Sequence, residues 1–558
     1  NPNNEYKIWS LNPTQPPKLD PGFKTSNSIY YSLSFLIKAG PLWIEVKSTK
    51  IFLKFHFDDP FLFFQINRLN PCLSLNLFLM LSLLITLPFF AVIVLLFVEK
   101  TNLWFHRNFA LFWSLLIFNF SILLLFMFDP TSSNFQLFCS INWLVLANSN
   151  AILGIDGIAL FMIILTAFLI PVCVLLSWSP TVKSNIKEYN IAFFILESIL
   201  FGVFCSLDLL MFYVLFEAVL IPMFFIVGVY GSRDRKIRAS YLLFLYTLIS
   251  SVFMLIAILA LYFWAGTTDY LKLQTIQFDP LIIKFVWIAF FLSFAVKMPL
   301  VPFHVWLPEA HAEAPTSGSV ILAGILLKLG GFGFIRFSLG LFSEASAFFT
   351  PLIFSISIFG VIYASLTTIQ QIDLKKIIAY SSVAHMGLVT IGIFSNNFQG
   401  ILGSILLMIS HGIVSGALFL CIGILYERHQ TRIVKYYSGL VHSMPIFTVC
   451  FIIFTLGNIG LPATSSFIGE ILIFIGCFEA NSWTALLSGS GMVLGIGYSL
   501  WLCNRIAFGN NKQFSILEFR DLNRREFYLL FPFIFLTFLF GLYPDIIVNY
   551  LKASIIVL

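Results

Sequence analysis

The chain has little charge. Of its 558 residues, 32 are Lys or Arg and 26 are Asp or Glu, which together make 10% of the sequence. An average soluble domain carries about 25% charged residues. Hydrophobic types make up 59% and aromatic residues 17%, so the charges are too few to cover a water-soluble globule of this length. A set of soluble domains is therefore excluded, and the composition predicts a helical membrane protein with many spans.

Paired cysteines and nucleotide motifs are also missing. The eight cysteines stand alone without a C-x-x-C pair, which argues against iron–sulfur or zinc ligation and against a disulfide framework. There is no G-x-x-x-x-G-K-[ST], G-x-G-x-x-G or H-E-x-x-H motif, so we expect no cofactor and no metal bound by this chain. The net charge is only +6 and no basic face with interleaved aromatics is visible, so we expect no nucleic-acid partner.

What the sequence does contain is long apolar runs. A helix needs ~20 mostly apolar residues to cross a bilayer, and fourteen runs qualify. They lie near 73–98, 109–128, 155–177, 189–206, 208–230, 239–265, 281–307, 318–340, 348–370, 377–395, 401–425, 443–476, 483–508 and 527–549. The sequence therefore predicts an all-α polytopic fold with about fourteen transmembrane helices.

Two of these runs are overlong and interrupted. The seventh contains Pro299 and Pro302, and the twelfth contains Gly457, Gly460 and Pro462 near its middle. Proline removes a backbone donor, and freed backbone groups at membrane depth must find partners in protein or water. Spans seven and twelve are therefore predicted to be broken helices.

The basic residues predict the orientation. Of the 24 Lys and Arg residues after position 70, seventeen fall in or beside alternate loops. By the positive-inside rule, those loops face the cytoplasm or matrix and both termini face the other side. One such loop, RDRKIR (233–238), is either a contact for anionic lipid or ordinary positive-inside charge.

Ionisable residues inside spans are costly and usually line a polar path. The deep candidates are Lys297, Lys328, Glu217 and Glu470, with His385 and His411 as buried imidazoles that could instead be satisfied core residues. Three further residues are accessory candidates. Glu197 could pair with a neighbouring helix, Asp208 lies at a turn, and Arg336 could snorkel from a span end.

The two broken spans suggest an internal repeat. Pairing spans seven and twelve gives two five-helix units, spans 4–8 and 9–13, and an odd number of spans requires the second unit to be inverted. Glu217 then matches His385, and Lys297 matches Glu470. The predicted divisions are an arm (1–71), three N-terminal helices (72–188), the first repeat (189–340), the second repeat (341–508) and a final loop and helix (509–558).

Six segments carry a family resemblance. AVKMPLVPFHVWLPEAHAEAP (295–315) resembles the most characteristic segment of the antiporter-like proton-pumping subunits of respiratory complex I. The other five are LDLLMFYVLFEAVLIPM (207–223), GILLKLGGFGFIRF (324–337), IDLKKIIAYSSVAHMG (372–387), SHGIVSGALFLCIGILYERHQTR (410–432) and SSFIGEILI (465–473). The resemblance covers some 485 residues from about residue 72 and is strongest to a mitochondrial member of the plant or protist type.

The resemblance implies fourteen helices with two inverted bundles, in agreement with the count above. It also implies roles. Glu217 and Lys297 form the acid–lysine pair of a half-channel toward the matrix, Lys328 is a central lysine, His385 and His411 belong to a hydrated axis, and Glu470 lies at an outward half-channel. Glu197 matches an acidic position of span four. The implied partners are other membrane-arm subunits, and NADH, FMN, iron–sulfur clusters and ubiquinone belong to the parent complex in the mitochondrial inner membrane.

Buried lysine and glutamate suit proton transfer. Burial lowers the proton affinity of a lysine amine and a nearby carboxylate raises it, so moving or protonating Glu217 would drive a proton from Lys297 toward Lys328. The HVWLPEAH stretch (304–311) has no rigid metal-site spacing and is predicted to order the break in span seven. Residues 1–71 are predicted to form an extended arm on the intermembrane-space side that contacts a partner, or else a poorly ordered tail.

Two other functions compete with complex I. A multisubunit cation/proton antiporter without redox activity shares the span-seven motif and the buried Glu/Lys pair. YERHQTR (426–432) and the tail from Phe519 to Asp545 favour complex I. A purely structural scaffold is disfavoured because it would not need to bury four or more ionisable groups.

Overall fold

The computed structural model describes residues 34–39, 42–47, 52–57, 71–144, 149–178, 185–510 and 520–557. The chain divides into two compact units, Asn1–Leu75 and Asn76–Leu558. Most of the predicted arm, including the proline-rich stretch 12–22, lies outside the described residues. The predicted division of the rest of the chain into three-helix, repeat and tail segments stays a prediction.

Within the first unit, the described backbone forms a three-stranded antiparallel sheet in the order β1–β2–β3. The strands are β1 (Ser34–Ala39), β2 (Leu42–Lys47) and β3 (Phe52–Phe57). In the register, Phe35 pairs with Val46 and Ile44 with Phe55. The predicted all-α fold class therefore does not extend to this segment.

The second unit is mainly helical, and thirteen of its described helical segments are long and apolar enough to cross a membrane. They are formed by α2 (Pro71–Phe97), α3 (Leu103–Met127), α4 (Gly157–Leu176), α5 (Ile186–Cys205), α6 (Leu209–Ala218) with α7 (Leu220–Tyr230), α8 (Lys236–Ala265), α10 (Pro280–Lys297), α12 (Thr316–Ile321) with η2 (Leu322–Leu326), α13 (Leu327–Gly333) and η3 (Phe334–Leu339), α14 (Ser343–Gln370), α15 (Leu374–Phe394), α16 (Phe398–His429), α20 (Ser482–Ala507) and α21 (Arg524–Leu542).

The remaining elements are short. They comprise α9 (Tyr270–Leu273), α11 (Trp306–Glu313), η4 (Val434–Tyr436), α17 (Leu440–Ser443), α18 (Pro445–Ile459), α19 (Ser465–Ala480) and α22 (Asp545–Ile556). The polytopic helical class is confirmed. The number fourteen stays a prediction, because it depends on α18 and α19 crossing the membrane together.

Both predicted breaks are present. Helix α10 ends at Lys297, and the chain turns before α11 begins at Trp306. Helix α18 ends at Ile459, and α19 begins at Ser465 after Gly460 adopts a left-handed φ of 76°. Lys297 is the last residue before its break, whereas Glu470 follows its break. The proposed equivalence of Lys297 and Glu470 in the two repeats therefore gains no support from their positions.

Two spans differ from the uninterrupted helices that were predicted. The fifth is divided at Val219 into α6 and α7, because Pro222 has no N–H to donate to the carbonyl of Ala218. The eighth contains two π-helical segments, η2 and η3, on either side of α13. Such segments are rare and frequent at functional sites, and Lys328 lies between them.

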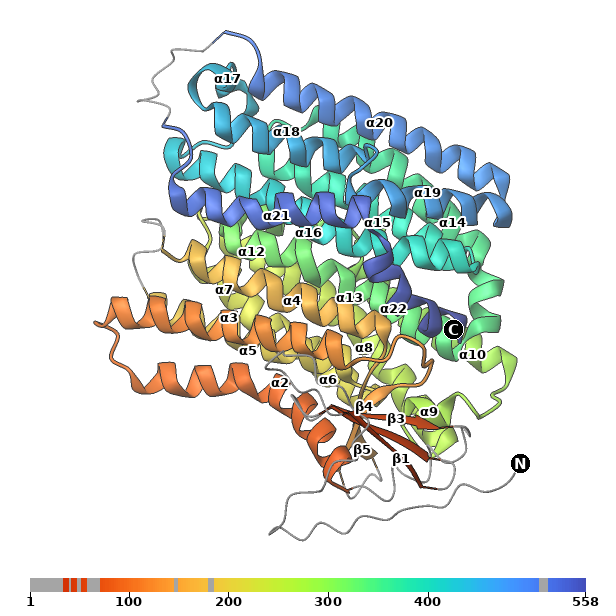
Figure 1. Cartoon of the computed structure of the whole chain (residues 1–558). Helices are drawn as coiled ribbons and strands as arrows, with labels where there is room; N and C mark the ends of the chain where they lie inside the picture. The colour runs from red at the N-terminus through yellow and green to blue at the C-terminus, as the bar shows by residue number, and fades with distance from the viewer. Residues whose placement is uncertain are drawn as a thin grey trace, which may run out of the picture. The chain divides into compact units, whose positions relative to one another are not determined.

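The core of the second unit is built around α16. This helix packs against α15 and α19 and also against α4, α12, η2, α18 and α21. Its membrane-spanning part is entirely buried, as is that of the α12–η3 span. Figure 1 shows α16 among the central helices, with α3 toward one edge of the second unit and α20 at the other. Three of the deep ionisable residues lie on α16 or on helices packed against it: His411 on α16, His385 on α15 and Glu470 on α19.

Sequence analysis missed a β-hairpin between the second and third spans. Strands β4 (Gln136–Leu144) and β5 (Ser149–Ile155) pair antiparallel. The hairpin is tied to the loop before α6, because the N–H of Leu207 donates to the carbonyl oxygen of Ile152 (2.8 Å). The search for apolar runs of membrane-spanning length cannot detect strands this short.

Candidate functional site

Four titratable residues form a file through the core. Lys328 on α13 donates from Nζ to His411 Nδ1 on α16 at 2.8 Å. The ring of His411 lies 5.6 Å, centroid to centroid, from that of His385 on α15. His385 Nδ1 is 3.7 Å from Glu470 Oε1 on α19. All four side chains are buried, so four helices contribute one row of proton-binding groups inside the membrane part of the fold.

The close approach of α16 and η2 brings Lys328 to His411. A Cβ on Gly412 would lie 3.0 Å from the carbonyl oxygen of Gly324 and 2.9 Å from a methyl group of Leu165. A contact of 3.0 Å with a backbone oxygen is tighter than nine in ten contacts of real Cβ atoms, so glycine at position 412 allows the two backbones to approach this closely. Lys328 is further held by donating to the carbonyl oxygen of Ala323 on η2.

A small cavity lies beside His385 and Glu470. Its volume is about 20 Å³, and its lining includes His385, Glu470, Asn458 and Tyr498. One water molecule needs roughly 10–15 Å³ of such space and two to four polar partners. The cavity therefore has the size and the polar groups to hold a water that completes the contact between the imidazole and the carboxylate.

A second cluster is built on α6 and α10. Lys297 donates from Nζ to the carbonyl oxygen of Phe216 at 3.2 Å and lies 4.2 Å above the centroid of the Phe216 ring. Glu217 follows directly in sequence and is only partly buried. In the described part of the chain no direct ion pair joins Glu217 and Lys297, but each lies close enough to act on the other's charge.

The two clusters lie on helices in direct contact. A Cβ on Gly330, two residues after Lys328, would be 2.9 Å from the backbone nitrogen of Met298, which follows Lys297. Helices α13 and α10 therefore meet at the break that ends α10. The structure thus brings together all six residues predicted for the main path, in two adjacent groups.

The three accessory residues have different surroundings. Asp208 is the N-cap of α6, where it accepts from the Met211 N–H at 3.0 Å and from the Thr268 hydroxyl. Arg336 is only 2% exposed and pairs with Asp156 at 2.7 Å. The snorkelling interpretation of Arg336 is therefore wrong, because its side chain turns inward to a carboxylate.

Glu197 on α5 is fully buried, and neither carboxylate oxygen has a hydrogen-bond partner among the described residues. The alternative that it pairs with a neighbouring helix is therefore not supported.

Sequence analysis did not single out Asn458 and Tyr498, which line the cavity beside His385 and Glu470, or Asp156, which pairs with Arg336. Asn458 stands inside an apolar run two residues before Gly460, and that polar position beside a helix break could have identified it. Tyr498 gave no such signal, because tyrosine is common in this chain.

In the motif at 304–311, His311 stacks on Phe419 with centroids 4.7 Å apart, and no three His, Cys, Asp or Glu residues gather within the described ranges.

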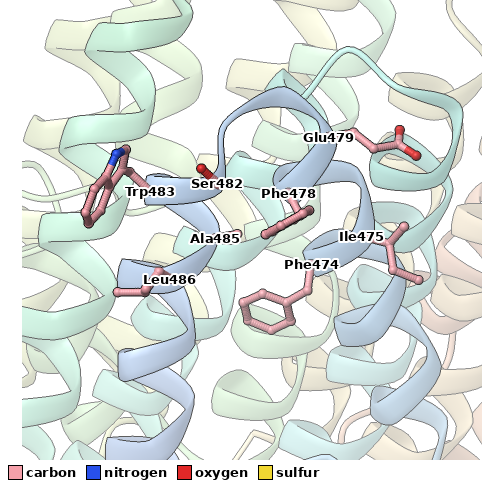
Figure 2. Close-up of a pocket in the computed structure, with 8 residues that line it drawn as sticks. All are labelled: Phe474, Ile475, Phe478, Glu479, Ser482, Trp483, Ala485 and Leu486. Atoms are coloured by element: carbon pink, nitrogen blue, oxygen red, sulfur yellow. The ribbon is translucent and has the colours of Figure 1, made fainter.

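Another cavity lies away from these residues. It measures about 780 Å³ and is lined by Phe474, Ile475 and Phe478 on α19 and by Trp483 and Leu486 on α20 (Figure 2). None of the six path residues lines it, and its walls are mainly apolar. It is therefore a hydrophobic groove at a helix–helix junction and not a proton-transfer site.

The fold and this constellation define a class of protein. Residues 206–497 match the family described as NADH:quinone oxidoreductase/Mrp antiporter. A chain in the structure of respiratory complex I from Thermus thermophilus with bound NADH is 28% identical and superposes with a TM-score of 0.77, over 86% of this chain and 99% of that one. The protein is an antiporter-like membrane subunit.

A relative narrows the class to a particular family. NADH-ubiquinone oxidoreductase chain 4 of Marchantia polymorpha is 57% identical over 475 residues, which is 85% of this chain and 96% of the relative. A chain of the Mrp complex from Dietzia has a TM-score of 0.73 over 86% of this chain and 52% of that chain, but at 17% identity it shows a shared fold alone. The chain belongs to the NADH-ubiquinone oxidoreductase chain 4 family.

The membership establishes the function in outline. The protein is a proton-translocating, antiporter-like subunit of NADH:ubiquinone oxidoreductase, and it is a multi-pass inner-membrane protein. The solved chain of 28% identity belongs to a respiratory complex I. The predicted function is confirmed in preference to an antiporter without redox activity.

Proposed function

We propose that protons cross this subunit through Glu217, Lys297, Lys328, His411, His385 and Glu470, in that order. The observation that carries the proposal is the buried file from Lys328 to Glu470, in which a 2.8 Å hydrogen bond, a 5.6 Å ring separation and a 3.7 Å ion-pair distance follow one another. A structural core would not need four ionisable groups in a row, since each one is costly to bury.

The contact between Lys328 and His411 can pass a proton directly. Lysine has only N–H donors when charged, so Nδ1 of His411 must present its lone pair to Nζ. A transfer breaks an Nζ–H bond and forms an Nδ1–H bond, which leaves a neutral amine and an imidazolium. His411 Nε2 has no hydrogen-bond partner in the described structure, and it can release the second proton toward His385 because imidazole relays by either nitrogen.

The step from His385 to Glu470 requires water. Their 3.7 Å separation is too long for a hydrogen bond, and the 20 Å³ cavity beside them supports one bridging molecule. Glu470 lies on α19, the half of the interrupted span that leads away from the basic loops. We infer that it releases protons to the intermembrane space, the side on which the positive-inside rule also predicts both termini.

Glu217 sets the charge of Lys297. With the carboxylate ionised, the ammonium of Lys297 is stabilised across the break at the end of α10. When Glu217 moves away or binds a proton, that stabilisation is lost and the proton leaves toward Lys328. Glu197, buried without a partner, is an accessory proton site, whereas Asp208 and Arg336 have structural surroundings.

The energy for this transfer comes from elsewhere in the complex. NADH, FMN, iron–sulfur clusters and ubiquinone belong to other subunits, and no cofactor is assigned to this chain. Neighbouring antiporter-like subunits of the membrane arm are its inferred partners, and the basic loop at 233–238 is a proposed contact for anionic lipid headgroups.

Glu217→Gln and Lys297→Met test the proposal in the assembled complex. Each removes a titratable group without changing side-chain volume greatly, so we expect proton pumping coupled to NADH oxidation to fall at least about tenfold, as for loss of a proton-transfer group. The measurement is the number of protons moved per electron in sealed vesicles.

Lys284→Met is the matched control, because Lys284 lies on the same helix but points to the Phe348 ring at 3.9 Å. We expect it to keep the parent ratio of protons to electrons. Parent-like ratios for both Glu217→Gln and Lys297→Met would overturn the assignment.

A further inference from the structure

The break between α18 and α19 leaves a backbone carbonyl without its helical partner. In a continuous helix the carbonyl of Asn458 would accept from the N–H four residues on, but that residue is Pro462, which has no N–H. The N–H of Leu461 donates instead to the carbonyl oxygen of Leu456 at 3.3 Å. Asn458 therefore presents two polar groups at the break, a main-chain carbonyl released from the helix and a side-chain amide.

Asn458 lines the small cavity beside His385 and Glu470. The walls of this cavity come from five helices, α14, α15, α18, α19 and α20. Ser365, on α14, also lines the cavity, but its hydroxyl donates within its own helix to the carbonyl oxygen of Val361 at 2.7 Å. The amide of Asn458 both donates and accepts hydrogen bonds and does not titrate. The relay proposed above gives Asn458 no role.

Contacts with two helices of the relay fix the backbone at Asn458. The hydroxyl of Ser466 on α19 donates to the carbonyl oxygen of Gly457, the residue before Asn458. A Cβ on Gly457 would lie 3.3 Å from a methyl group of Val414 on α16. The end of α18 is therefore bonded to one of these helices and packed closely against the other, which holds Asn458 at the cavity wall.

The step from His385 to Glu470 makes two demands on the bridging water. The water must accept a proton from the imidazolium while it gives one to the carboxylate, and it must then turn back to its starting orientation. A carboxamide suits both stages, because its oxygen accepts an O–H bond of the water and its nitrogen donates to a lone pair.

The freed carbonyl of Asn458 adds an electrostatic contribution. It lies at the C-terminal end of α18, which is the negative end of the helix dipole and favours a positive charge nearby. In transporters with broken spans, freed carbonyls and the C-terminal ends of half-helices hold cations and protons in this way. Asn458 is therefore suited to stabilise the imidazolium of His385 before the proton leaves it.

We propose that Asn458 is a positioning residue for proton transfer from His385 to Glu470, and that it acts by orienting the water between them. This inference rests on the proposed relay and names the group that controls its last internal step. In the transfer an N–H bond of His385 breaks as an O–H bond forms on the water. A second O–H bond of that water breaks as the Glu470 carboxylate gains a proton, which leaves a neutral imidazole and a carboxylic acid. Asn458 neither gains nor loses a proton.

Asn458→Leu in the assembled complex tests the proposal, because it removes the amide and keeps a side chain of similar size. We expect the number of protons moved per electron in sealed vesicles to fall at least about tenfold, as for loss of orientation at a reacting group. Asn190→Leu is the matched control, since Asn190 is also buried in a span but donates to the His106 carbonyl oxygen at 3.3 Å, outside the relay. It should keep the parent ratio. A parent-like ratio in Asn458→Leu would overturn the proposal.

Asn458→Asp supplies a pH profile that a purely structural role would not produce. A protonated carboxyl group donates and accepts as the amide does, whereas an ionised one only accepts. The titratable groups that line the cavity around position 458 are Glu470, His385 and Tyr498, with the ring of His411 on α16 lying 5.6 Å beyond that of His385. The Glu470 carboxylate opposes ionisation of a second carboxyl group beside it.

We therefore expect Asn458→Asp to pump nearly as well as the parent at low pH and to lose pumping as the pH rises, over a range in which the parent ratio stays constant. Pumping that is lost to the same degree at every pH would contradict the proposal. This measurement also decides the matter if Asn458→Leu fails to assemble.

Glu470→Gln in the same experiment separates this proposal from the relay. If Glu470→Gln lowers pumping but Asn458→Leu does not, the role of Asn458 is wrong and the relay stands. If neither variant lowers pumping, the last step of the relay is wrong and the role of Asn458 falls with it.

Discussion

Asp156 and Asp208 stand at the starts of α4 and α6, where each accepts a hydrogen bond from a backbone N–H of the first turn. Asp279 and Asp373 do the same for α10 and α15. An aspartate before an apolar run is a preferred N-cap, since it satisfies an amide that the helix leaves unpaired. These four aspartates therefore cap helix starts, and none of them is assigned to the proposed proton path.

Asp156 is more than a cap, because its carboxylate also pairs with Arg336 at 2.7 Å. The Arg336 guanidinium lies 4.8 Å and 4.9 Å from the ring centroids of Phe135 and Phe332. In Asp156→Asn the amide oxygen keeps the cap but the charge is lost, which leaves Arg336 buried without a counter-ion. Removing one partner of a buried pair costs roughly 3–5 kcal/mol, so we expect a lower thermal midpoint of the complex. Asp279→Asn, at the exposed cap of α10, should leave the midpoint unchanged, and equal midpoints in both variants would contradict the role of the pair.

At the scale of elements, interruptions place the functional groups. Lys297 ends α10 at the first break, Glu217 lies two residues before the kink at Val219, and Lys328 stands between η2 and η3. Backbone carbonyl groups near these points accept from the lysines, as Phe216 does from Lys297 and Ala323 from Lys328. Irregular backbone at membrane depth is tolerated where it lines a polar path, and these helices follow that rule.

Gly460, at the second break, lies close to the Glu470 carboxylate. It has a φ of 76°, and a Cβ there would collide with the Glu470 carboxylate. Gly460→Ala should therefore displace Glu470 and lower proton pumping per electron at least about tenfold, in addition to the roughly 1–2 kcal/mol that a left-handed alanine costs. Gly266→Ala has a similar φ of 68° but no heavy atom within 4 Å of the added Cβ. Gly266→Ala has the same backbone cost but should pump normally. Equal pumping in the two alanine variants would therefore contradict the proposal that Gly460 positions the Glu470 carboxylate.

The sequence was sufficient for the features that depend on local composition. Apolar runs marked the spans, Pro299 with Pro302 marked the first break, and Gly460 with Pro462 marked the second. It did not reveal the π segments around Lys328, which pack against different neighbours in the fold, η2 against α16 and η3 against α10 and α14. Nor could it show that Arg336 reaches Asp156, since the two residues are 180 positions apart and meet only in the folded chain.

At the scale of the whole molecule, the uneven distribution of basic loops and the proposed path together predict the direction of proton transfer across the membrane. The basic loops lie at one end of the helices, whereas Glu470 lies on the half-span that leads to the opposite end. Protons taken up from the side of the basic loops and released past Glu470 would leave the matrix. The orientation therefore decides whether the relay can act as a pump in the expected direction.

That orientation can be measured with two exposed residues. Asp234 lies in the basic loop after α7, and Gln277 lies in the loop between α9 and α10 at the predicted opposite side. By the positive-inside rule, a membrane-impermeant thiol reagent should label Gln277→Cys from the intermembrane space and Asp234→Cys only from the matrix. An even number of spans must separate two loops on the same side, so labelling of both from one side would contradict the predicted span order. Labelling with the sides exchanged would reverse the direction of the relay, because Glu470 would then face the matrix.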